Sequence, residues 1–293
     1  MPNLKEVRNR IVSVKSTQQI TSAMKLVAAS KLRRAQNAIL TMRPYASKLQ
    51  ELLQDLSGNI DEMEGSAYTE ERGEEKILLV AVTSNKGLCG AFNSHVIKKV
   101  KQILENDFKS QYQSGNLDLF FFGKKALDHF TKRKYKNVSG DTDLLDKLNF
   151  ESTLPFAQKF MEAFSDKKYD KIIMIYNQFK NAAVQKLVTE QYLPIIPPEG
   201  REEQSITSDY IFEPSKEEIV KEIIPKSLKI QLYKALLDSY ASEQGARMTA
   251  MHNATDNAKE LVKELQLKYN KARQSAITNE LIEIVSGAEA LRG

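Results

Sequence analysis

Residues 226–286, KSLKIQLYKALLDSYASEQGARMTAMHNATDNAKELVKELQLKYNKARQSAITNELIEIVS, contain no proline and a single glycine, Gly245. This composition predicts one helix of about sixty residues, whereas helices of globular proteins usually span roughly 8–20. At about 1.5 Å per residue, such a helix is roughly 90 Å long. Because no small domain is that wide, most of the helix must pack its apolar side chains against a partner outside such a domain.

The N-terminus offers that partner, because residues 4–56 contain one proline, Pro44, and no glycine. Their apolar residues recur at steps of three and four, with a shift of phase near residues 21–24, as in a coiled coil. The expected seam is Leu4, Val7, Ile11, Val14, Gln18, Thr21, Met24, Ala28, Leu32, Ala35, Ile39, Met42, Ala46, Leu49, Leu53 and Leu56. Its counterpart is Met248, Met251, Ala254, Ala258, Leu261, Leu265, Tyr269, Ala272 and Ala276. The pattern favours an antiparallel pair, with two unrelated helices on a globular core as the alternative.

The middle of the chain differs in kind. Residues 76–83 form a continuous apolar run, as expected of a buried parallel strand. Further strands are expected at 117–122, 171–176 and 182–193, and helices at 93–106, 124–132 and 156–164. This alternation predicts a Rossmann-like α/β domain with a mostly parallel sheet. The expected division is an N-terminal coiled-coil helix (1–57), an acidic, flexible linker (58–75), the α/β domain (76–208), and a C-terminal segment with the long helix (209–293).

The charge of the chain is unevenly placed. The formal net charge is +5, yet residues 1–48 alone carry ten lysines and arginines and one glutamate, which gives +9. Such a helix favours an acidic partner. Nucleic acid, an anionic membrane, an acidic protein surface and a merely solvated face all remain open. Aromatic residues are absent between Leu4 and Pro44, which disfavours single-stranded nucleic acid, and we expect no large apolar groups on the free face, which disfavours membrane insertion.

Composition excludes several classes. No apolar run approaches the roughly 18–20 residues that cross a bilayer. The first residues lack the apolar core of a signal peptide and a Ser/Arg-rich leader, which favours a bacterial or already mature chain. The lone Cys89 excludes an internal disulfide and fits a reducing compartment.

The loop at residues 84–92 lies between a strand and a helix, where a nucleotide phosphate could bind. It lacks both the G-x-G-x-x-G spacing and the G-x-x-x-x-G-K-[ST] cradle, and Lys86 precedes the glycines. We therefore interpret Gly87 and Gly90 as enabling a tight turn, with Leu88 and Phe92 packed beneath it. The following residue, Asn93, is expected to cap the next helix.

Other reactive residues do not form a site. Cys89 is interpreted as a small buried thiol rather than a nucleophile, because no triad accompanies it. The three histidines, His95, His129 and His252, lack metal-ligand spacing. Asp141, Asp143 and Asp146 resemble the start of a calcium loop, but the required Gly and Glu are missing. We expect no catalytic residue, cofactor or metal.

Four segments carry a resemblance. They are AITNELIEIVSGAEA (276–290), ITSAMKLVAASK (20–31), TSNKGLCG (83–90), and SEQGARM (242–248) together with ATDNA (254–258). In this order, and across the whole chain, they closely resemble the gamma subunit of bacterial F-type ATP synthases. The two-cysteine regulatory insertion of chloroplast members is absent, and His252 stands where a lysine is common. We expect this histidine to face solvent, with a pH-sensitive role as the alternative.

The resemblance implies a non-catalytic rotor. Its coiled coil would stand inside a hexamer of alpha and beta subunits, with the α/β body and the epsilon subunit on the membrane c ring. Ion flow would turn the ring, and the shaft would drive the beta sites through different nucleotide affinities. The complex would lie on the cytoplasmic face of the bacterial inner membrane, with this chain as a peripheral subunit and without contact to nucleic acid.

The resemblance also assigns residues. Contact with the alpha–beta hexamer falls to Met24, Lys25, Arg33, Arg34, Arg273, Gln274, Thr278 and Glu280, the first four facing an acidic loop of beta. A hydrophobic tip falls to Ile277, Leu281, Ile284, Val285, Ala288 and Leu291. Contact with the c ring and epsilon falls to Tyr210, Ile211, Phe212 and Glu213. Arg247 is either a hexamer or coiled-coil contact or a solvated arginine. A free-standing α/β enzyme with a helical arm and a basic nucleic-acid binder are the rival functions.

Overall fold

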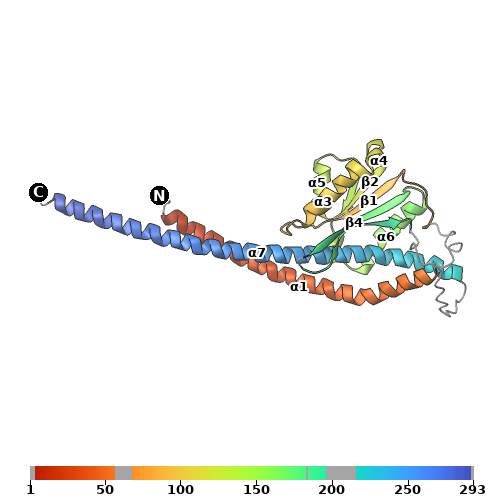
Figure 1. Ribbon diagram of the computed structural model, residues 1–293, viewed down its shortest axis with the longest axis horizontal. Coiled ribbons are helices and arrows are strands. Elements are labelled where there is room, and N and C mark those ends of the chain that lie inside the picture. Colours follow the sequence, from red (N-terminus) through yellow and green to blue (C-terminus); the bar gives the residue numbers. More distant parts are fainter. Residues whose placement is uncertain (1–3, 57–67, 183, 196–215, 292–293) are drawn as a thin grey trace. The chain divides into compact units, whose positions relative to one another are not determined.

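The computed structural model describes residues 4–56, 68–182, 184–195 and 216–291 (Figure 1). The chain forms two compact units, one made of Met1–Ala28 with Arg247–Gly293 and the other of Ala29–Ala246. The division passes through both long helices, α1 (Leu4–Leu56) and α7 (Lys216–Ala290). Among the described residues, no helix is both long and apolar enough to span a membrane.

Helix α7 begins ten residues before the expected start at 226, because Pro225 does not end it. The neighbours Ile224 and Leu228 are 0% and 1% exposed. A proline inside a helix costs about 3 kcal/mol, whereas burying each aliphatic side chain stabilises by about 1.5–3 kcal/mol. Burial therefore outweighs the lost backbone hydrogen bond, and a prediction that stops at proline is wrong here.

The unit of Met1–Ala28 and Arg247–Gly293 is an antiparallel helix pair (Figure 1). The hydroxyl of Thr255 donates to Oγ1 of Thr21 at 2.8 Å, and Thr21 in turn donates to the carbonyl of Gln18. This contact lies at the shift of phase that the sequence marks, where polar residues interrupt the seam. Because the two helices run antiparallel, Leu4 lies as far before Thr21 as Ala272 lies after Thr255. The two residues are therefore opposite each other.

Burial confirms the expected seam in this pair. Val7, Thr21 and Ala28 are buried on α1, and Met251, Ala258 and Leu265 are buried on α7. One position differs, because Leu261 is 36% exposed and the neighbouring Val262 is 7% exposed. From Ala258 the seam therefore advances four residues to Val262 instead of three to Leu261. It then advances three residues and rejoins the expected seam at Leu265.

The other unit contains a five-stranded sheet in the order β3-β2-β1-β4-β5. Its strands are β1 (Ile77–Val82), β2 (Leu117–Phe122), β3 (Val138–Asp141), β4 (Lys171–Phe179) and β5 (Gln185–Leu193). Four strands run parallel, and β5 pairs with β4 antiparallel. The mostly parallel sheet is thus confirmed, whereas β3 was missed because its sequence, Val-Ser-Gly-Asp, carries too little apolar character.

Each face of the sheet is covered. Alternate residues of β1, including Ile77, pack on α3 (Phe92–Gln102) and α5 (Lys124–Lys132) through Val96 and Phe130. The other face, which includes Leu78, packs on Phe160 of α6 (Phe150–Ser165) and on the first part of α7. A π-helix (Ile103–Asp107) and a short helix α4 (Lys109–Ser114) follow α3, and a 3-10 helix (Leu144–Lys147) precedes α6. Continuous burial of β1 therefore follows from cover on two sides.

One glycine of α7, Gly245, has a packing reason. A Cβ at Gly245 would lie 3.2 Å from the backbone of Ala182, so α7 approaches the segment between β4 and β5 closely. Nearby, Oγ of Ser242 donates to the carbonyl of Asn177 at 3.0 Å. A larger residue at 245 would force these elements apart.

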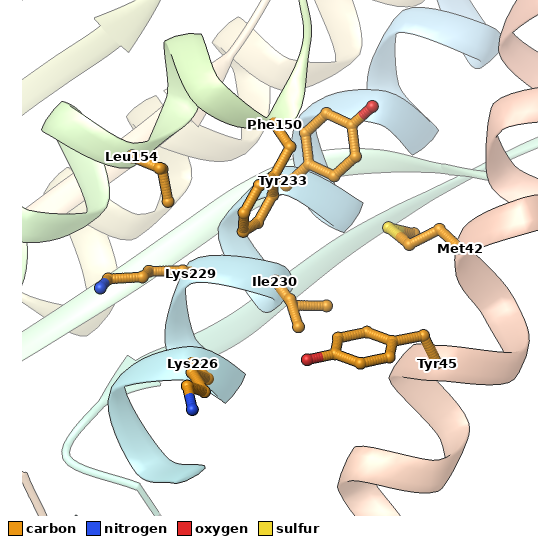
Figure 2. Close-up of a pocket in the computed structure, with 8 residues that line it drawn as sticks. All are labelled: Met42, Tyr45, Phe150, Leu154, Lys226, Lys229, Ile230 and Tyr233. Atoms are coloured by element: carbon orange, nitrogen blue, oxygen red, sulfur yellow. The ribbon is translucent and has the colours of Figure 1, made fainter. Parts of the chain in front are cut away.

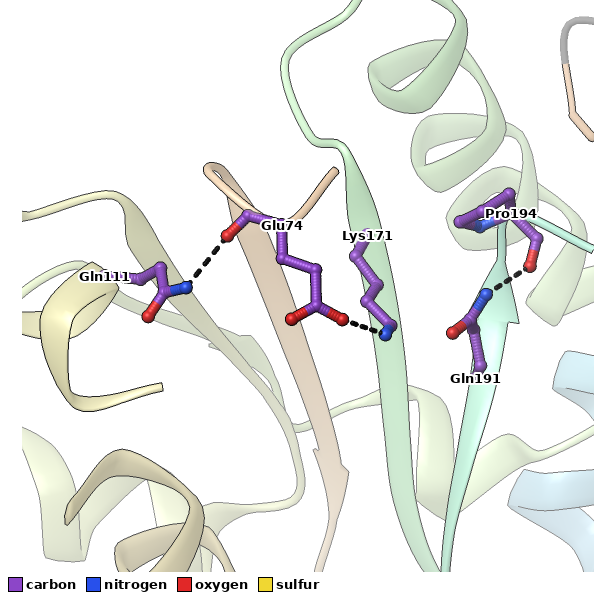
Figure 3. Close-up of polar contacts among 5 residues, drawn as sticks. All are labelled: Glu74, Gln111, Lys171, Gln191 and Pro194. Atoms are coloured by element: carbon purple, nitrogen blue, oxygen red, sulfur yellow. Dashed lines mark hydrogen bonds and ion pairs between the residues drawn. The ribbon is translucent and has the colours of Figure 1, made fainter. Parts of the chain in front are cut away.

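The last part of the expected linker, from residue 68 onward, is tied to the α/β domain. Figure 3 shows Gln111 donating to the carbonyl of Glu74 at 3.0 Å and Lys171 paired with the Glu74 carboxylate. Nη1 of Arg72 donates to the carbonyl of Phe164 at 2.7 Å. On the antiparallel edge, Gln191 donates to the carbonyl of Pro194. The contacts of Glu74 and Arg72 fix the entry into β1, which the glycines and acidic residues of the segment did not indicate.

Candidate partner-binding surfaces

The loop after β1 is held by its own side chains. Asn93 does not cap α3, whose cap position is Ala91. Its side chain instead accepts from the backbone of Ser84 at 2.9 Å and donates to Oγ of Ser84 at 2.7 Å and to Sγ of Cys89 at 3.2 Å. Two residues, Leu88 and Gly90, adopt positive φ. The expectation that Asn93 caps a helix is therefore wrong, since the residue closes the loop.

Burial in this loop corrects a second expectation. Phe92 is buried beneath the turn as expected, whereas Leu88 is 63% exposed, because its left-handed backbone turns the side chain outward. Cys89 is 2% exposed, which confirms the buried thiol. Asp141 accepts from the backbone of Asp143 and Leu144 and so starts the 3-10 helix. The described residues contain no group of three or more potential metal-binding side chains.

The expected contact residues of α1 are accessible. Arg33 and Arg34 are exposed, and Met24 and Lys25 are partly buried. Within the described part of the chain, none of the three cations among them, Lys25, Arg33 and Arg34, forms an ion pair. The expectation of a free face without large apolar groups is wrong, because Val12, Ile20, Leu26, Val27 and Leu40 are exposed on α1. Basic and apolar side chains side by side suit a protein partner that offers both acidic and apolar groups.

The C-terminal turns of α7 are exposed without exception from Ile277 to Leu291. They include all residues of the expected tip: Ile277, Leu281, Ile284, Val285, Ala288 and Leu291. The other expected contacts on this helix, Arg273, Gln274, Thr278 and Glu280, are exposed as well. The register accounts for this exposure, since Leu4, the first described residue of α1, lies opposite Ala272 and no described part of α1 runs along the later turns of α7. Large apolar groups gathered on such a free helix end indicate a binding surface.

Two further residues have defined outcomes. Arg247 is 8% exposed, so its interpretation as a solvated arginine is wrong. His252 is exposed as expected, with Nδ1 placed 3.4 Å from the carboxylate of Asp256 one turn later. Tyr210, Ile211, Phe212 and Glu213 lie outside the described residues, so their expected contact with a c ring and epsilon stays a prediction.

The structure adds an apolar pocket that sequence reasoning missed (Figure 2). It has a volume of about 540 Å³ and is lined by Met42, Tyr45, Phe150, Leu154, Lys226, Lys229, Ile230 and Tyr233. Phe150 and Tyr233 meet edge to face, with ring centroids 5.7 Å apart. The sequence contains a signal for the wall of the pocket that α6 provides. Asn149 and Ser152 form a capping box, which starts α6 at Phe150 rather than near residue 156. Exposed aromatic groups around a pocket mark a site where a partner can insert side chains.

A buried carboxylate lies close to this pocket. Asp238 is 5% exposed and lines a second cavity of about 250 Å³ with Arg43 and Lys234. Burial raises the pKa of Asp238 to about 6, although the positive charges of Lys234 and Arg43 oppose the shift. The carboxylate of Glu190, which accepts from Tyr176 and Gln231, adds to it.

Fold and surfaces together define an assembly protein: a helix pair with free basic and apolar side chains joined in sequence to an α/β domain. A family model described as ATP synthase matches residues 3–291. The ATP synthase gamma chains of Christiangramia forsetii and Flavobacterium johnsoniae are 56% and 58% identical over 293 residues, covering all of both chains. This chain belongs to the family of ATP synthase gamma chains.

Solved structures agree with this assignment. A chain of the Tetrahymena thermophila mitochondrial ATP synthase, from a structure of the central stalk and c ring, is 26% identical with a TM-score of 0.57. The match covers 80% of this chain and 99% of that one. A chain from the rotor of the Euglena gracilis enzyme has the same fold, with a TM-score of 0.65 at 22% identity, covering 94% and 98%.

Proposed function

We propose that this chain is the central-stalk rotor of an F-type ATP synthase. It couples rotation of a membrane c ring to the conformational cycle of catalytic beta subunits, and it performs no catalysis itself. Its complex lies at the cytoplasmic face of a bacterial inner membrane. The observation that carries this proposal is the free end of α7, an unpaired helix with apolar side chains, in a chain that matches its family over residues 3–291.

The exposed tip holds the rotor in place. Burying a leucine, isoleucine or valine side chain stabilises by about 1.5–3 kcal/mol, so the six exposed leucine, isoleucine and valine residues among 277–291 supply several kcal/mol on entering an apolar sleeve. A sleeve that surrounds the tip at every angle gives the same energy at every angle. Because only differential contacts shift a conformational equilibrium, the tip contributes to assembly and not to coupling.

Coupling therefore falls to groups that meet one beta subunit at a time. Lys25, Arg33 and Arg34 are such groups, since each occupies a single angular position around α1 and none has an ion-pair partner in the described residues. An acidic loop of beta would be attracted only when these cations face it. A two-helix shaft has no three-fold symmetry, so three identical beta subunits around it necessarily experience different contacts.

The apolar pocket of Figure 2 fits a second partner. We assign it to the epsilon subunit, because the pocket lies on the unit that contains the α/β domain and offers Phe150, Tyr233 and Ile230 to an inserted apolar side chain. This unit is the body that family resemblance places beside epsilon.

A charge-reversal variant tests the proposal. Lys25→Glu, Arg33→Glu and Arg34→Glu together should leave ATP hydrolysis by the assembled complex within about twofold, yet lower ATP-driven ion pumping at least about fivefold, on the scale of typical coupling energies. Ion pumping in inverted vesicles is measured beside hydrolysis. The matched control reverses three exposed lysines of the α/β domain, Lys109, Lys124 and Lys136. Pumping that survives the α1 reversal, or falls equally in the control, refutes the acidic-loop contact.

A further inference from the structure

A basic groove lies on the side of the α/β domain that carries α3, α4 and α5, and it shares no residue with the surfaces assigned above. We define it as the cavity of about 330 Å³ lined by Lys101, Leu104, Glu105, Tyr112, Arg133, Lys134 and Tyr135. Its walls come from the end of α3, the π-helix, α4 and the turn that follows α5. All of these residues belong to the unit Ala29–Ala246.

Positive charge in the groove is not compensated. Lys101, Arg133 and Lys134 form no ion pair with any residue that the structure describes, and Glu105 is the single acidic residue of the lining. Cations that converge on a concave surface repel one another and raise the local concentration of anions.

One of these cations is held in place. Nη1 of Arg133 lies 3.0 Å from Nδ1 of His129, so the guanidinium donates and the imidazole accepts. This role requires a neutral imidazole. Burial lowers the pKa of His129, and the charges of Arg133 and Lys101 lower it further, which keeps the ring neutral. The guanidinium is thus positioned before any ligand arrives, which reduces the entropy lost on binding.

The aromatic walls are also fixed. The rings of Tyr112 and Tyr135 lie 6.1 Å apart between centroids, and Tyr135 packs edge to face on the buried Phe130 at 4.8 Å. Burial raises the pKa of Tyr135, so its hydroxyl keeps its proton and can donate. The wall beside them is a π-helix, in which the backbone N–H of Phe108 reaches the carbonyl of Ile103 at 2.9 Å. Such turns are rare and occur frequently at functional sites.

We propose that the basic groove binds a phosphate-bearing anion with at least two negative charges, of which a diphosphate group is the simplest. Arginine forms paired hydrogen bonds to phosphate oxygens, and lysine adds a point charge. The volume lies at the lower end of the range of small-molecule sites, roughly 300–1,000 Å³. The three cations and one carboxylate of the lining leave two positive charges in excess. An anion with two negative charges neutralises this excess, whereas a monoanion neutralises only part of it.

This inference goes beyond the rotor function and does not depend on it. The groove shares no residue with the tip, with the cations of α1 or with the apolar pocket. Its test measures binding of an anion directly to the chain, so the result does not depend on whether the rotor proposal is correct.

The test is calorimetric titration of the full chain with sodium pyrophosphate at about 0.15 M salt, where the screening length is about 8 Å and diffuse attraction is weak. The groove variant is Lys101→Gln with Arg133→Gln. The control is Lys98→Gln with Lys132→Gln, which removes the same charge from exposed positions outside the lining. Circular dichroism verifies that each variant is folded, and Tyr135→Phe, which keeps the ring, serves as a second probe.

We expect one pyrophosphate per chain, with affinity lowered at least about tenfold in the groove variant, equivalent to about 1.4 kcal/mol, and unchanged in the control. Weaker binding in Tyr135→Phe would support the hydroxyl contact. Equal losses in both charge variants would show diffuse attraction and overturn the proposal, as would the absence of wild-type binding at millimolar pyrophosphate. Inorganic phosphate and phosphatidylglycerol vesicles are titrated in separate experiments. Binding to vesicles that pyrophosphate does not displace would contradict the groove as a site for a small anion.

Discussion

Gly123 shows how a single residue fixes the end of a strand. It follows β2 with φ of +97°, and a Cβ there would lie 2.1 Å from the carbonyl oxygen of Thr83. Thr83 is itself held, because its backbone N–H donates to the carbonyl of Phe122 at 2.8 Å. No side chain fits without moving β1 away from β2.

Substituting this glycine should therefore be costly. We expect Gly123→Ala to destabilise the chain by more than about 3 kcal/mol, since steric overlap adds to the roughly 1 kcal/mol of a left-handed backbone. Gly73→Ala is the matched control, because Gly73 has φ of +89° and open space around its Cβ position. Urea denaturation measures both, and equal costs would show that backbone conformation alone explains Gly123.

The buried carboxylate of Asp238 predicts a pH dependence. An acid whose pKa is higher in the folded chain binds more protons when folded, so its ionisation opposes folding above pH 6. The opposition fades as the pH falls towards 4. With its pKa raised from 3.8 to about 6, the full effect is about 3 kcal/mol.

Asp238→Asn should thus stabilise the chain at pH 7.5 by up to about 3 kcal/mol and lose this advantage near pH 4. Denaturant unfolding at both pH values is the measurement. Asp256→Asn, at an exposed position beside His252, should change stability by less than about 1 kcal/mol at either pH. A gain for Asp238→Asn that is the same at pH 4 and pH 7.5 would contradict the titration.

Some residue roles were beyond sequence reasoning for a physical reason. Asn93 precedes a helical pattern, and only the folded loop shows that Ser84 and Cys89 compete for its side chain. For Arg247 the sequence left a contact and a solvated arginine equally open, and only the structure shows that the residue is buried. The basic groove joins residues more than thirty positions apart, so no local spacing could reveal it.

Elements with a strong period were predictable. The seam of α1 was identified down to its shift of phase, because close helix packing demands small or apolar residues every three or four positions. Weak elements were not. β3 is short and polar, and the start of α7 lies beyond a proline, where only tertiary burial of Ile224 and Leu228 preserves the helix.

The alanine seam gives a prediction at this scale. Ala28 is 1% exposed on α1, so Ala28→Leu should overpack the helix pair and destabilise it by about 1–3 kcal/mol. Ala23→Leu, on the exposed face of the same helix, should be nearly neutral, because leucine is almost as good a helix former as alanine. Thermal melting followed by circular dichroism compares them, and equal melting temperatures would mean that α1 and α7 are not packed closely at Ala28.

For the whole molecule, the proposed function gives the tip and the cations of α1 separate tasks. Apolar contacts that are equal at every angle would supply affinity, and charged contacts that change with angle would supply coupling. The apolar tip and the basic contacts were predicted through family resemblance, since periodicity alone left the partner of the basic helix open. Among the described residues, α1 lies along α7 only as far as Ala272, which leaves the tip exposed.

Rotation is the most direct test of the central claim. With a cysteine introduced at the exposed Lys109, a gold rod can be attached to this chain inside a complex with alpha and beta subunits fixed to glass, because native Cys89 is only 2% exposed. The account predicts that ATP drives sustained rotation of the rod in one direction and that rotation stops when ATP is removed. ATP hydrolysis by the same complexes with only random fluctuation of the rod would contradict it.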